Sequence, residues 1–356
     1  MIIAITNQKG GCGKTTTAIN LAASLAAMKQ RTLLIDLDPQ THASLGLGIR
    51  SENLDCSIYN VLTERQEQHQ FLENAISSFS DNLDVAPGHV LLSTIEQEFV
   101  EKDHAVGKLK SVLENLVFPY QYVVIDCPPS LGFLTFNALF AADLAIVPLE
   151  LGSFALYGVA KLLSMVELLR VKLNHAPKVF ALATMIDLRS RFSKEMLSKM
   201  RDSFKDNFFE TMIRMNIACR ESQQLGVPIR FHQETSRAAE DYMSLARELM
   251  ARCTDQIEWS EIDEFSKMAQ GRVREFQVAA PTADMVHLVG DFNGWRIDES
   301  SRLWGKGRGS WCKRILLKPG RYRYKFVVDG KWVPDPINNL AEPNPYGGID
   351  SIVEIY

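Results

Sequence analysis

The feature that most constrains this chain is a glycine-rich run near its N-terminus, Gln8-Lys9-Gly10-Gly11-Cys12-Gly13-Lys14-Thr15-Thr16. A phosphate-binding loop has a glycine, four residues and then Gly-Lys-Ser/Thr; here Gln8 replaces the first glycine and Lys9 follows it. Apolar residues predict a strand before the run and a helix after it. Backbone N–H groups of such a loop close around phosphate oxygens, and the helix N-terminus adds favourable dipole charge. Residues 10–16 therefore predict a phosphate site, in which Lys14 contacts the β- and γ-phosphates and Thr15 holds Mg²⁺.

Composition narrows the class of protein. The chain has 356 residues, of which 46% are hydrophobic, so two or three folded domains are expected. The formal net charge is −4, so the chain as a whole is not a polycation. The absence of an apolar run of about 18 residues argues against a membrane span. The six cysteines form no Cys-x-x-Cys pair, which favours a cytoplasmic protein with reduced thiols and no structural metal.

The N-terminal part of the chain alternates between strand-like and helix-like patterns. Strand-like runs occur at Ile2–Thr6, Arg31–Asp36, Leu83–Ala86, Tyr122–Asp126, Leu144–Leu149 and Val179–Ile186. Helical patterns lie between several of them, for example at Leu156–Leu173. The alternation predicts an α/β P-loop NTPase fold, with a mostly parallel sheet flanked by helices. Ligands of such sheets bind at the carboxyl ends of the strands, which is where Lys14 is expected.

The pattern changes near residue 270. From Ser236 to about Met268 the chain reads as charged helix, and past Gly271 it turns to short alternating runs separated by Gly and Pro. We therefore predict an α/β domain over residues 1–252, a helical linker over 253–271 and an all-β domain over 272–356.

Acidic residues follow two of the predicted strands. Leu33–Gln40 ends one strand with Asp36 and Asp38, and Val123–Ser130 ends another with Asp126. A carboxylate at the tip of a buried strand is costly unless it meets a metal, a water or a donor. Asp126 suits orienting Mg²⁺ through its water shell, Asp38 suits positioning the attacking water, and Asp36 is a further candidate for the metal. Acids also cap such loops in ordinary α/β domains, which is the structural alternative.

These segments resemble the ParA/Soj partition ATPases, relatives of MinD with a deviant Walker A loop. The resemblance runs from Ile2 to about Ala251 and includes Ile5-Thr6-Asn7-Gln8-Lys9, Asp36-Leu37-Asp38-Pro39-Gln40 and Asp126-Cys127-Pro128-Pro129-Ser130-Leu131-Gly132. It implies an ATPase that uses ATP and Mg²⁺, forms a homodimer on ATP binding and responds to a ParB-like activator protein.

The resemblance also implies roles for particular residues. Lys9 is expected to cross to the partner subunit's phosphates, and Asp38 to align the attacking water. Lys14 and Thr15 keep the phosphate and Mg²⁺ roles given above. Cys12 replaces the usual valine or isoleucine, so it packs as a small apolar residue but puts a thiol beside the phosphate-binding amides. Whether its oxidation blocks the site is open.

ParA-type dimers bind duplex DNA without sequence preference, through basic residues on one face. Between Asp187 and Lys205 six basic residues stand against three acidic ones. Arg189 lies where the family places a DNA-contacting arginine, with Arg191 beside it. At a second position where the family has an arginine, this chain has Ala218. Arg220, two residues later, is the candidate to replace that lost positive charge. A solvated helix face is the alternative reading of these charges.

The last part of the chain carries a signature of its own. It includes Val286–Trp295, with Asp-Phe-Asn-Gly-Trp, and Pro319–Trp332, with Tyr-Lys-Phe-x-x-Asp-Gly-x-Trp. Period-two alternation puts Tyr322, Tyr324, Phe326 and Val328 on one face of a strand and Arg323 and Lys325 on the other. Asp-Gly before Lys331 predicts a tight hairpin turn. These patterns predict a β-sandwich, and the resemblance described next implies that it is immunoglobulin-like (early-set).

This segment resembles the glycogen-binding module of the AMP-activated protein kinase β subunit and of glycogen-branching enzymes. The resemblance implies that Trp295 and Trp332 stack on glucose rings and that Lys325 hydrogen-bonds a hydroxyl. Asp350 stands at the family's asparagine position, where it can accept a hydrogen bond but not donate one. The alternative is a sandwich whose tryptophans are core or protein-contact residues.

Together these features predict a cytoplasmic ATPase, associated with the nucleoid through DNA, that positions a cargo and carries a module for α-glucan, such as glycogen, or a glucan-associated partner. The other function class that stays open is a nucleotide-switched scaffold or regulator of polysaccharide metabolism without DNA binding. A MinD-like membrane ATPase is disfavoured, because the C-terminal pattern is a β-domain and not an amphipathic helix.

Overall fold

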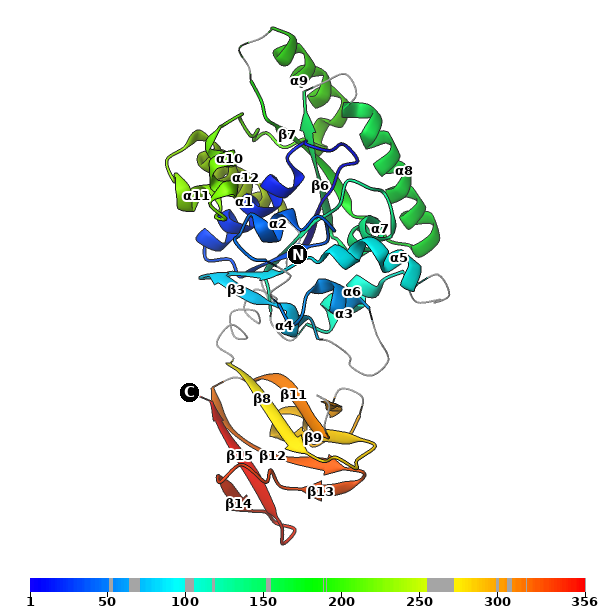
Figure 1. Cartoon of the computed structure of the whole chain (residues 1–356), viewed down its shortest axis with the longest axis vertical. Coiled ribbons are helices and arrows are strands. Elements are labelled where there is room, and N and C mark those ends of the chain that lie inside the picture. Colours follow the sequence, from blue (N-terminus) through cyan, green and yellow to red (C-terminus); the bar gives the residue numbers. More distant parts are fainter. Residues whose placement is uncertain are drawn as a thin grey trace. The chain divides into compact units, whose positions relative to one another are not determined.

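The computed structural model of the chain separates into two compact units (Figure 1). The residues that it describes are 1–50, 54–63, 71–99, 106–116, 119–151, 155–187, 189, 191–254, 272–298, 301–305, 309–317 and 319–355. The predicted linker over 253–271 lies outside these residues, apart from Cys253 and Thr254, which end a helix. The linker and the exact domain bounds therefore stay predictions.

A seven-stranded sheet organises the first unit. Its strands are β1 (Ile2–Ile5), β2 (Thr32–Asp36), β3 (Ser77–Ser80), β4 (Leu83–Ala86), β5 (Tyr122–Asp126), β6 (Leu144–Glu150) and β7 (Lys178–Thr184), in the order β3-β4-β2-β5-β1-β6-β7. All neighbours are parallel except β3 and β4, which confirms the predicted mostly parallel sheet. The edge strand β3 was not predicted, because Phe79 is its only large apolar residue.

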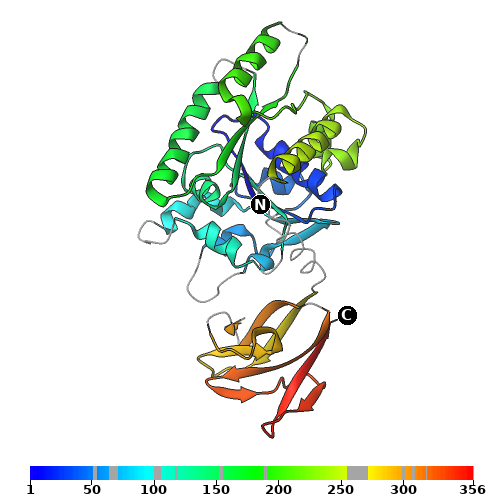
Figure 2. The ribbon, with the colours of Figure 1, turned by 180° about the vertical axis from the view of Figure 1, so that it is seen from behind.

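Helices flank this sheet. The longer ones are α1 (Lys14–Ala27), α7 (Phe133–Ala141), α8 (Ala155–Leu173), α9 (Arg191–Phe204) and α12 (Arg237–Thr254). Shorter helical segments are α2 (His42–Leu45), α3 (Ile58–Leu62), α4 (Leu72–Ala75), η2 (Val90–Thr94), α5 (Ile95–Glu98), α6 (Lys108–Glu114), η3 (Lys205–Asn207), α10 (Ala218–Gln224) and α11 (Ile229–His232). Figures 1 and 2 show α1 and α10–α12 grouped on one side of the sheet and α6–α8 on the other. Because both faces are covered, β2 and β5 are buried at every position and read as unbroken apolar runs.

A large apolar core lies between the sheet and the α1–α12 side. Ile3 and Ile5 of β1 belong to it together with Leu21 of α1, and Tyr242 and Leu245 of α12. Fully burying one such side chain contributes about 1.5–3 kcal/mol. This packing anchors the strand before the glycine-rich loop and the helix after it, so the loop between them is held at the carboxyl edge of the sheet.

The second unit is all-β. Its strands are β8 (Arg272–Ala279), β9 (Val286–Gly290), β10 (Trp304–Gly305), β11 (Ser310–Leu317), β12 (Gly320–Val328), β13 (Lys331–Val333), β14 (Ala341–Pro343) and β15 (Ile349–Ile355), with η4 (Asp291–Asn293) after β9. They form a three-stranded sheet, β10-β11-β8, and a five-stranded sheet, β13-β12-β15-β14 with β9 also paired to β12. All pairs are antiparallel, as the predicted sandwich requires.

The predicted alternation along β12 is confirmed. Tyr324 and Phe326 lie in the core of this unit, with Tyr322 and Val328 packed at its border. The Asp329-Gly330 turn joins Val328 and Lys331 directly, and both turn residues have positive φ, 45° and 81°. This is the backbone that a two-residue hairpin needs.

Among the residues that the structure describes, no helix is long and apolar enough to span a membrane.

Candidate functional site

The glycine-rich loop has the backbone of a phosphate site. Gly11 and Gly13 have positive φ, 72° and 87°, and Gly13 caps the N-terminus of α1. A Cβ added at Gly10 or Gly11 would meet no atom within 4 Å, so this stretch of backbone borders open space. Lys14 is only 7% exposed, and its Nζ donates to the carbonyl oxygen of Lys9 at 3.1 Å. The loop is therefore shaped as a cradle, with the ammonium group of Lys14 folded across it.

Lys9 is tied to its own subunit. Its Nζ pairs with Glu150 at the end of β6, and both side chains are about 40% exposed. Its backbone N–H donates to Asn7 Oδ1 at 3.0 Å, and Asn7 Nδ2 donates to Pro148 O at 2.8 Å. The carbonyl oxygen of Lys9 also accepts from the Cys12 thiol at 3.2 Å. The predicted intersubunit lysine thus has partners within its own chain.

Strand register brings the predicted acids together. Asp126 is the Cα partner of Asp36 on β2 and also of Ile5, the last residue of β1 before the loop. The three strands end at the same edge of the sheet, as parallel neighbours do. Residues about 90 positions apart in sequence therefore flank the phosphate loop from one side.

Asp126 has an environment that fits a metal. It is fully buried, and no group among the described residues meets hydrogen-bond geometry with either of its carboxylate oxygens, although the Thr15 hydroxyl lies near enough to favour its charged form. Burial raises its pKa well above the usual value and nearby Asp36 raises it further, while Thr15 and Lys14 oppose the shift. A buried carboxylate without donors is costly, and Mg²⁺ with its water shell would supply the missing charge and donors.

The rest of a magnesium site would come from outside the carboxylates. Within the described ranges, no cluster of three or more His, Cys, Asp or Glu could hold a metal by itself. Mg²⁺ commonly takes one or two protein ligands and completes its shell with water and substrate phosphates. Thr15 and Asp126, beside the phosphate cradle, match that pattern.

Asp36 and Asp38 have different surroundings. Asp36 is fully buried, and burial raises its pKa to about 6, against hydrogen bonds from Ser44 and Asp38 that lower it. Its Oδ2 accepts from the backbone and hydroxyl of Ser44, and its Oδ1 accepts from the Asp38 N–H. Asp38 is 6% exposed and its Oδ1 accepts from the Gln40 N–H at 2.9 Å. Both oxygens of Asp36 are thus engaged by the protein, unlike those of Asp126.

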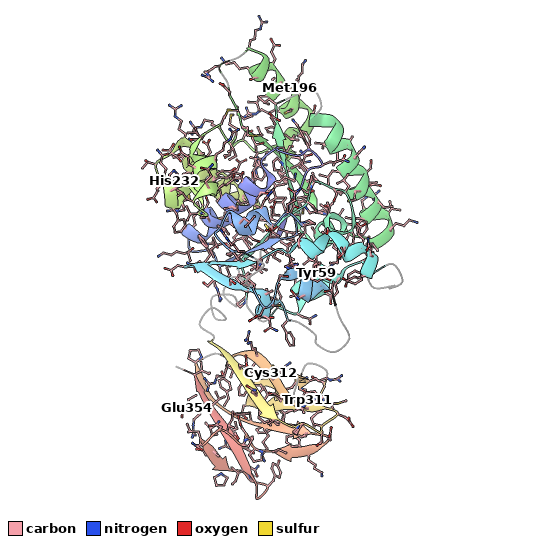
Figure 3. The ribbon with its side chains drawn as sticks, in the orientation of Figure 1. Tyr59, Met196, His232, Trp311, Cys312 and Glu354 are labelled. Carbon is pink, nitrogen blue, oxygen red and sulfur yellow. The ribbon has the colours of Figure 1, made fainter. Side chains whose placement is uncertain are left out.

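Several residues at this site were not found from the sequence. Gln223 on α10 donates from Nε2 to Thr16 Oγ1 at 2.8 Å, and Thr184 Oγ1 donates to Cys12 O at 2.8 Å. Apart from these loop contacts, His232 of α11, labelled in Figure 3, lies 3.1 Å from Glu221 of α10. Glu150 and Ser44 were also missed. Gln223, Thr184, Glu150 and Ser44 belong to no motif, and only the packing of separate segments brings the first three to the loop and Ser44 to Asp36.

The predicted DNA residues lie after β7, on α9 and on α10. Arg189 follows β7 and Arg191 begins α9; their side chains are more than 90% exposed, but each pairs with an acid of the same chain, Asp187 and Glu195. Arg220 is exposed on α10, and no acid among the described residues pairs with it. The structure therefore shows three exposed guanidinium groups, two of which already have a carboxylate partner.

The four predicted carbohydrate residues gather in the second unit. The rings of Trp295 and Trp332 lie 6.2 Å apart at an interplanar angle of 33°, and Trp332 is 48% exposed. Lys325 Nζ lies 2.9 Å from Asp350 Oδ1, and both residues are mostly buried. Asn344, which sequence reasoning missed, donates to the same oxygen at 2.7 Å. The open part of this surface is therefore the tryptophan pair, next to a satisfied polar cluster.

The Asp-Phe-Asn-Gly-Trp segment explains how Trp295 is presented. Asp291 accepts from the Trp295 ring N–H at 3.0 Å and from the Arg323 backbone at 2.7 Å. Asn293 closes the turn by accepting from Gly290 N at 3.0 Å, and Gly294 has a positive φ of 61°. Asp291, Asn293 and Gly294 of the motif thus each have a local structural role in the turn that carries Trp295.

Comparison with known proteins follows the two units. Residues 1–179 match the family model described as AAA domain, and residues 279–356 match the glycogen recognition site of AMP-activated protein kinase. The chromosome partitioning protein ParA of Myxococcus xanthus is 41% identical over 254 residues, which cover 71% of this chain and 89% of that protein. The sporulation initiation inhibitor protein Soj of Bacillus subtilis is 39% identical over 251 residues, covering 70% and 98%.

Solved structures that are similar to this chain include nucleotide-bound proteins. Cobyrinic acid a,c-diamide synthase from Mycobacterium smegmatis, with bound ADP and magnesium, is 29% identical with a TM-score of 0.62, covering 72% of this chain and 95% of that one. A putative plasmid partition protein from Borrelia burgdorferi, bound to AMPPNP, is 26% identical with a TM-score of 0.58, covering 72% and 99%. Both neighbours hold an adenine nucleotide or its analogue.

Proposed function

The chain belongs to the ParA/Soj family of partition ATPases, and we propose that it is an ATP-switched dimer that positions a cargo through non-specific DNA binding. ATP hydrolysis is the activity of the family, and the described fold provides its P-loop. The C-terminal module, in this proposal, attaches an α-glucan such as glycogen, or a protein bound to one. A ParB-like activator triggers hydrolysis, and the protein works on the nucleoid in the cytoplasm.

The observation that carries the ATPase proposal is the buried carboxylate of Asp126 beside the phosphate cradle, which makes no hydrogen bond of normal geometry to any described residue. In the proposal, Lys14 leaves the Lys9 carbonyl and contacts the β- and γ-phosphates, while Thr15 and Asp126 face the metal. Thr15 and Asp126 would hold Mg²⁺, which would supply positive charge against the negative charge that develops during phosphoryl transfer. Asp38 orients the attacking water. These roles use the residues that the sheet already brings to one edge.

Dimerisation is proposed to change the partner of Lys9. In the single chain, its ammonium group is held by Glu150, an exposed contact worth about 1 kcal/mol or less. A bound triphosphate on the partner subunit carries several negative charges and is the stronger attractor. The exchange of Glu150 for phosphate would then couple ATP binding to dimer formation.

Two substitutions test this cycle. Lys9→Ala is expected to bind ATP but stay monomeric and fail to hydrolyse, because the cross-subunit contact is lost. Asp38→Ala is expected to form a stable ATP-bound dimer that binds DNA but hydrolyses ATP slowly, because the phosphate contacts survive. Size exclusion with ATP, combined with a DNA mobility assay, measures both. An ATP-bound Asp38→Ala protein that stays monomeric would overturn the proposed cycle.

The glucan proposal rests on the paired indoles. Aromatic faces suit the C–H surfaces of sugar rings, and two rings inclined at 33° offer a broad apolar platform. Lys325 and Asp350 are mostly buried and paired, so their contribution is a hydrogen bond at the margin of that platform. Neither tryptophan belongs to the core cluster of this unit, which favours a binding role over a packing role.

Affinity electrophoresis of the full chain in glycogen gels tests this proposal. Trp295→Ala and Trp332→Ala should each abolish most of the retardation, with the thermal midpoint of the second unit nearly unchanged. A lost stacking contact is worth about 1 kcal/mol. Trp311→Ala is the control, because Trp311 packs against the core and should lower the thermal midpoint. Wild-type protein that is not retarded would end the glucan proposal.

One observation favours a second candidate, a nucleotide-switched scaffold without DNA binding. Arg189 and Arg191 are already paired with Asp187 and Glu195, which reduces the positive charge that they present to a phosphate backbone. A wild-type protein that dimerises with ATP but shows no DNA shift at low salt would support the scaffold.

A further inference from the structure

A buried hydrogen-bond network joins the end of β2 to α2 and to the loop after β4. Ser44 donates twice to Asp36 Oδ2, from its backbone N at 2.8 Å and from its Oγ at 2.6 Å. The other carboxylate oxygen, Oδ1, accepts from the Asp38 N–H at 3.2 Å. Ser44 Oγ in turn accepts from the Gly88 N–H at 3.0 Å. One carboxylate and one hydroxyl thus connect three separate segments.

The network is closely packed. Asp36 and Ser44 are fully buried, so no solvent replaces these hydrogen bonds. A Cβ on Gly88 would lie 3.0 Å from both Cγ and the backbone oxygen of Asp36, closer than side chains normally approach. Any larger residue at position 88 would require Asp36 or the chain after β4 to shift by a few tenths of an ångström. The carboxylate therefore has one orientation, set by Ser44 on one side and by the Gly88 backbone on the other.

Asp38 depends on this network for its own placement. Its N–H is held by Asp36, its carbonyl oxygen accepts from the Thr41 N–H at 2.8 Å, and its Oδ1 accepts from the Gln40 N–H. The turn that carries Asp38 is thus anchored at its start by Asp36. Asp36 is anchored in turn by both donors of Ser44.

We propose that Ser44 is a positioning residue for ATP hydrolysis: it locks Asp36, and Asp36 locks the backbone that aims Asp38 at the attacking water. This inference rests on the proposed role of Asp38. It also separates the two buried acids by task. Both oxygens of Asp36 accept well-formed hydrogen bonds from protein donors, whereas those of Asp126 make none of normal geometry with the described groups, so Asp36 supports Asp38 and Asp126 faces the metal.

The proposal predicts a split between turnover and binding. Ser44 lies outside the phosphate loop, so its loss should leave ATP affinity intact while Asp38 is misaimed. Small errors of this kind cost up to about 100-fold in rate. We expect Ser44→Ala to lower kcat between about 10- and 100-fold, with KM and the Kd of a fluorescent ATP analogue within about 2-fold of wild type. Ser44→Thr, which keeps the hydroxyl, should recover most of the rate.

A double-mutant cycle shows whether Ser44 acts through Asp38. Because both residues serve one function, Ser44→Ala should cost no further rate in an Asp38→Ala background. Ser24→Ala is the matched control, since Ser24 is a buried serine of the same unit on α1, ten residues past Lys14. It should leave kcat and KM unchanged. If Ser44→Ala does not fold, Ser44→Cys, which keeps a weak donor, takes its place and should show the same split.

Each outcome decides a separate point. The inference would be overturned if Ser44→Ala kept the wild-type kcat, or if its KM changed by as large a factor as its kcat. It would also be overturned if Ser44→Thr did not recover the rate. Full additivity with Asp38→Ala would also overturn it. If Asp38→Ala itself keeps the wild-type kcat, the proposed role of Asp38 fails first. If Asp38→Ala is slow while Ser44→Ala is not, only the positioning role of Ser44 fails.

Discussion

For Cys12, the sequence predicted the small apolar character of the site but not the hydrogen bond that its thiol makes. It is fully buried, as a small apolar residue at this place would be. Burial also raises the pKa of its thiol, against the opposing charge of Lys14. Because the thiolate is the reactive form, this environment disfavours oxidation. Its hydrogen bond to the Lys9 carbonyl gives the thiol a use that valine or isoleucine cannot supply.

The environment of Asp126 leads to a prediction about stability. Asp126→Asn removes a buried charge that has no described partner, so the ligand-free variant should melt higher than wild type at neutral pH. For a unit of this size, each 1 kcal/mol gained raises the midpoint by about 2–4 °C. The variant should also lose most of the stabilisation that Mg-ATP gives wild type. Thermal scans with and without Mg-ATP measure both effects, and an unchanged Mg-ATP stabilisation would contradict the metal role.

At the scale of elements, local sequence patterns predicted a helix or strand correctly where the element packs one apolar face against a hydrophobic core. The alternation along β12 was confirmed because its apolar side chains pack inward and its neighbours pair on both sides. The predicted helix at Leu156–Leu173 matches α8, Ala155–Leu173. The edge strand β3 was missed because β4 supplies its pairing and its own residues carry little periodic signal.

The β12–β13 hairpin yields a second prediction. Gly330 has φ of 81°, and a Cβ there would meet nothing within 4 Å, so Gly330→Ala is penalised by backbone conformation alone. We expect a loss of about 1–2 kcal/mol in the stability of the second unit. Gly305→Ala is the matched control, because that site is equally open but its φ is not positive. Denaturant melts of both variants decide it; equal stabilities would show that the turn does not need a glycine.

At the scale of the whole molecule, charge is unevenly divided. Residues 1–271 carry 26 basic and 33 acidic side chains, and residues 272–356 carry 13 and 10, giving net charges of −7 and +3. A chain with an acidic ATPase half does not bind DNA by overall attraction. The proposed DNA binding would therefore depend on particular exposed arginines, of which Arg189, Arg191 and Arg220 are the candidates, and on the two copies of each in a dimer.

This dependence gives a third prediction. Each phosphate contact contributes a slope of about −0.9 to the plot of log affinity against log salt. In an ATP-bound dimer, Arg189→Ala should lose two contacts and flatten the slope by about 2, with unchanged ATP affinity. Arg191→Ala should do the same. Arg170→Ala, an exposed arginine of α8 paired with Glu167, is the control and should leave the slope unchanged. Titrations between about 50 and 200 mM salt measure the slopes.

The sequence by itself determined the features that depend on neighbours in the chain: the glycine-rich loop, its flanking strand and helix, the acids at strand ends, the hairpin turn and the two fold classes. These follow from periodicity, from turn chemistry and from motifs a few residues long. Only the tertiary structure decided which groups meet. The strand order placed Asp126 beside Asp36, and the close approach of Gly88 set the orientation of the Asp36 carboxylate. Glu150 pairs with Lys9, although the two residues are 141 positions apart in the chain. Contacts between distant segments follow from packing and register, which leave no local mark on the sequence.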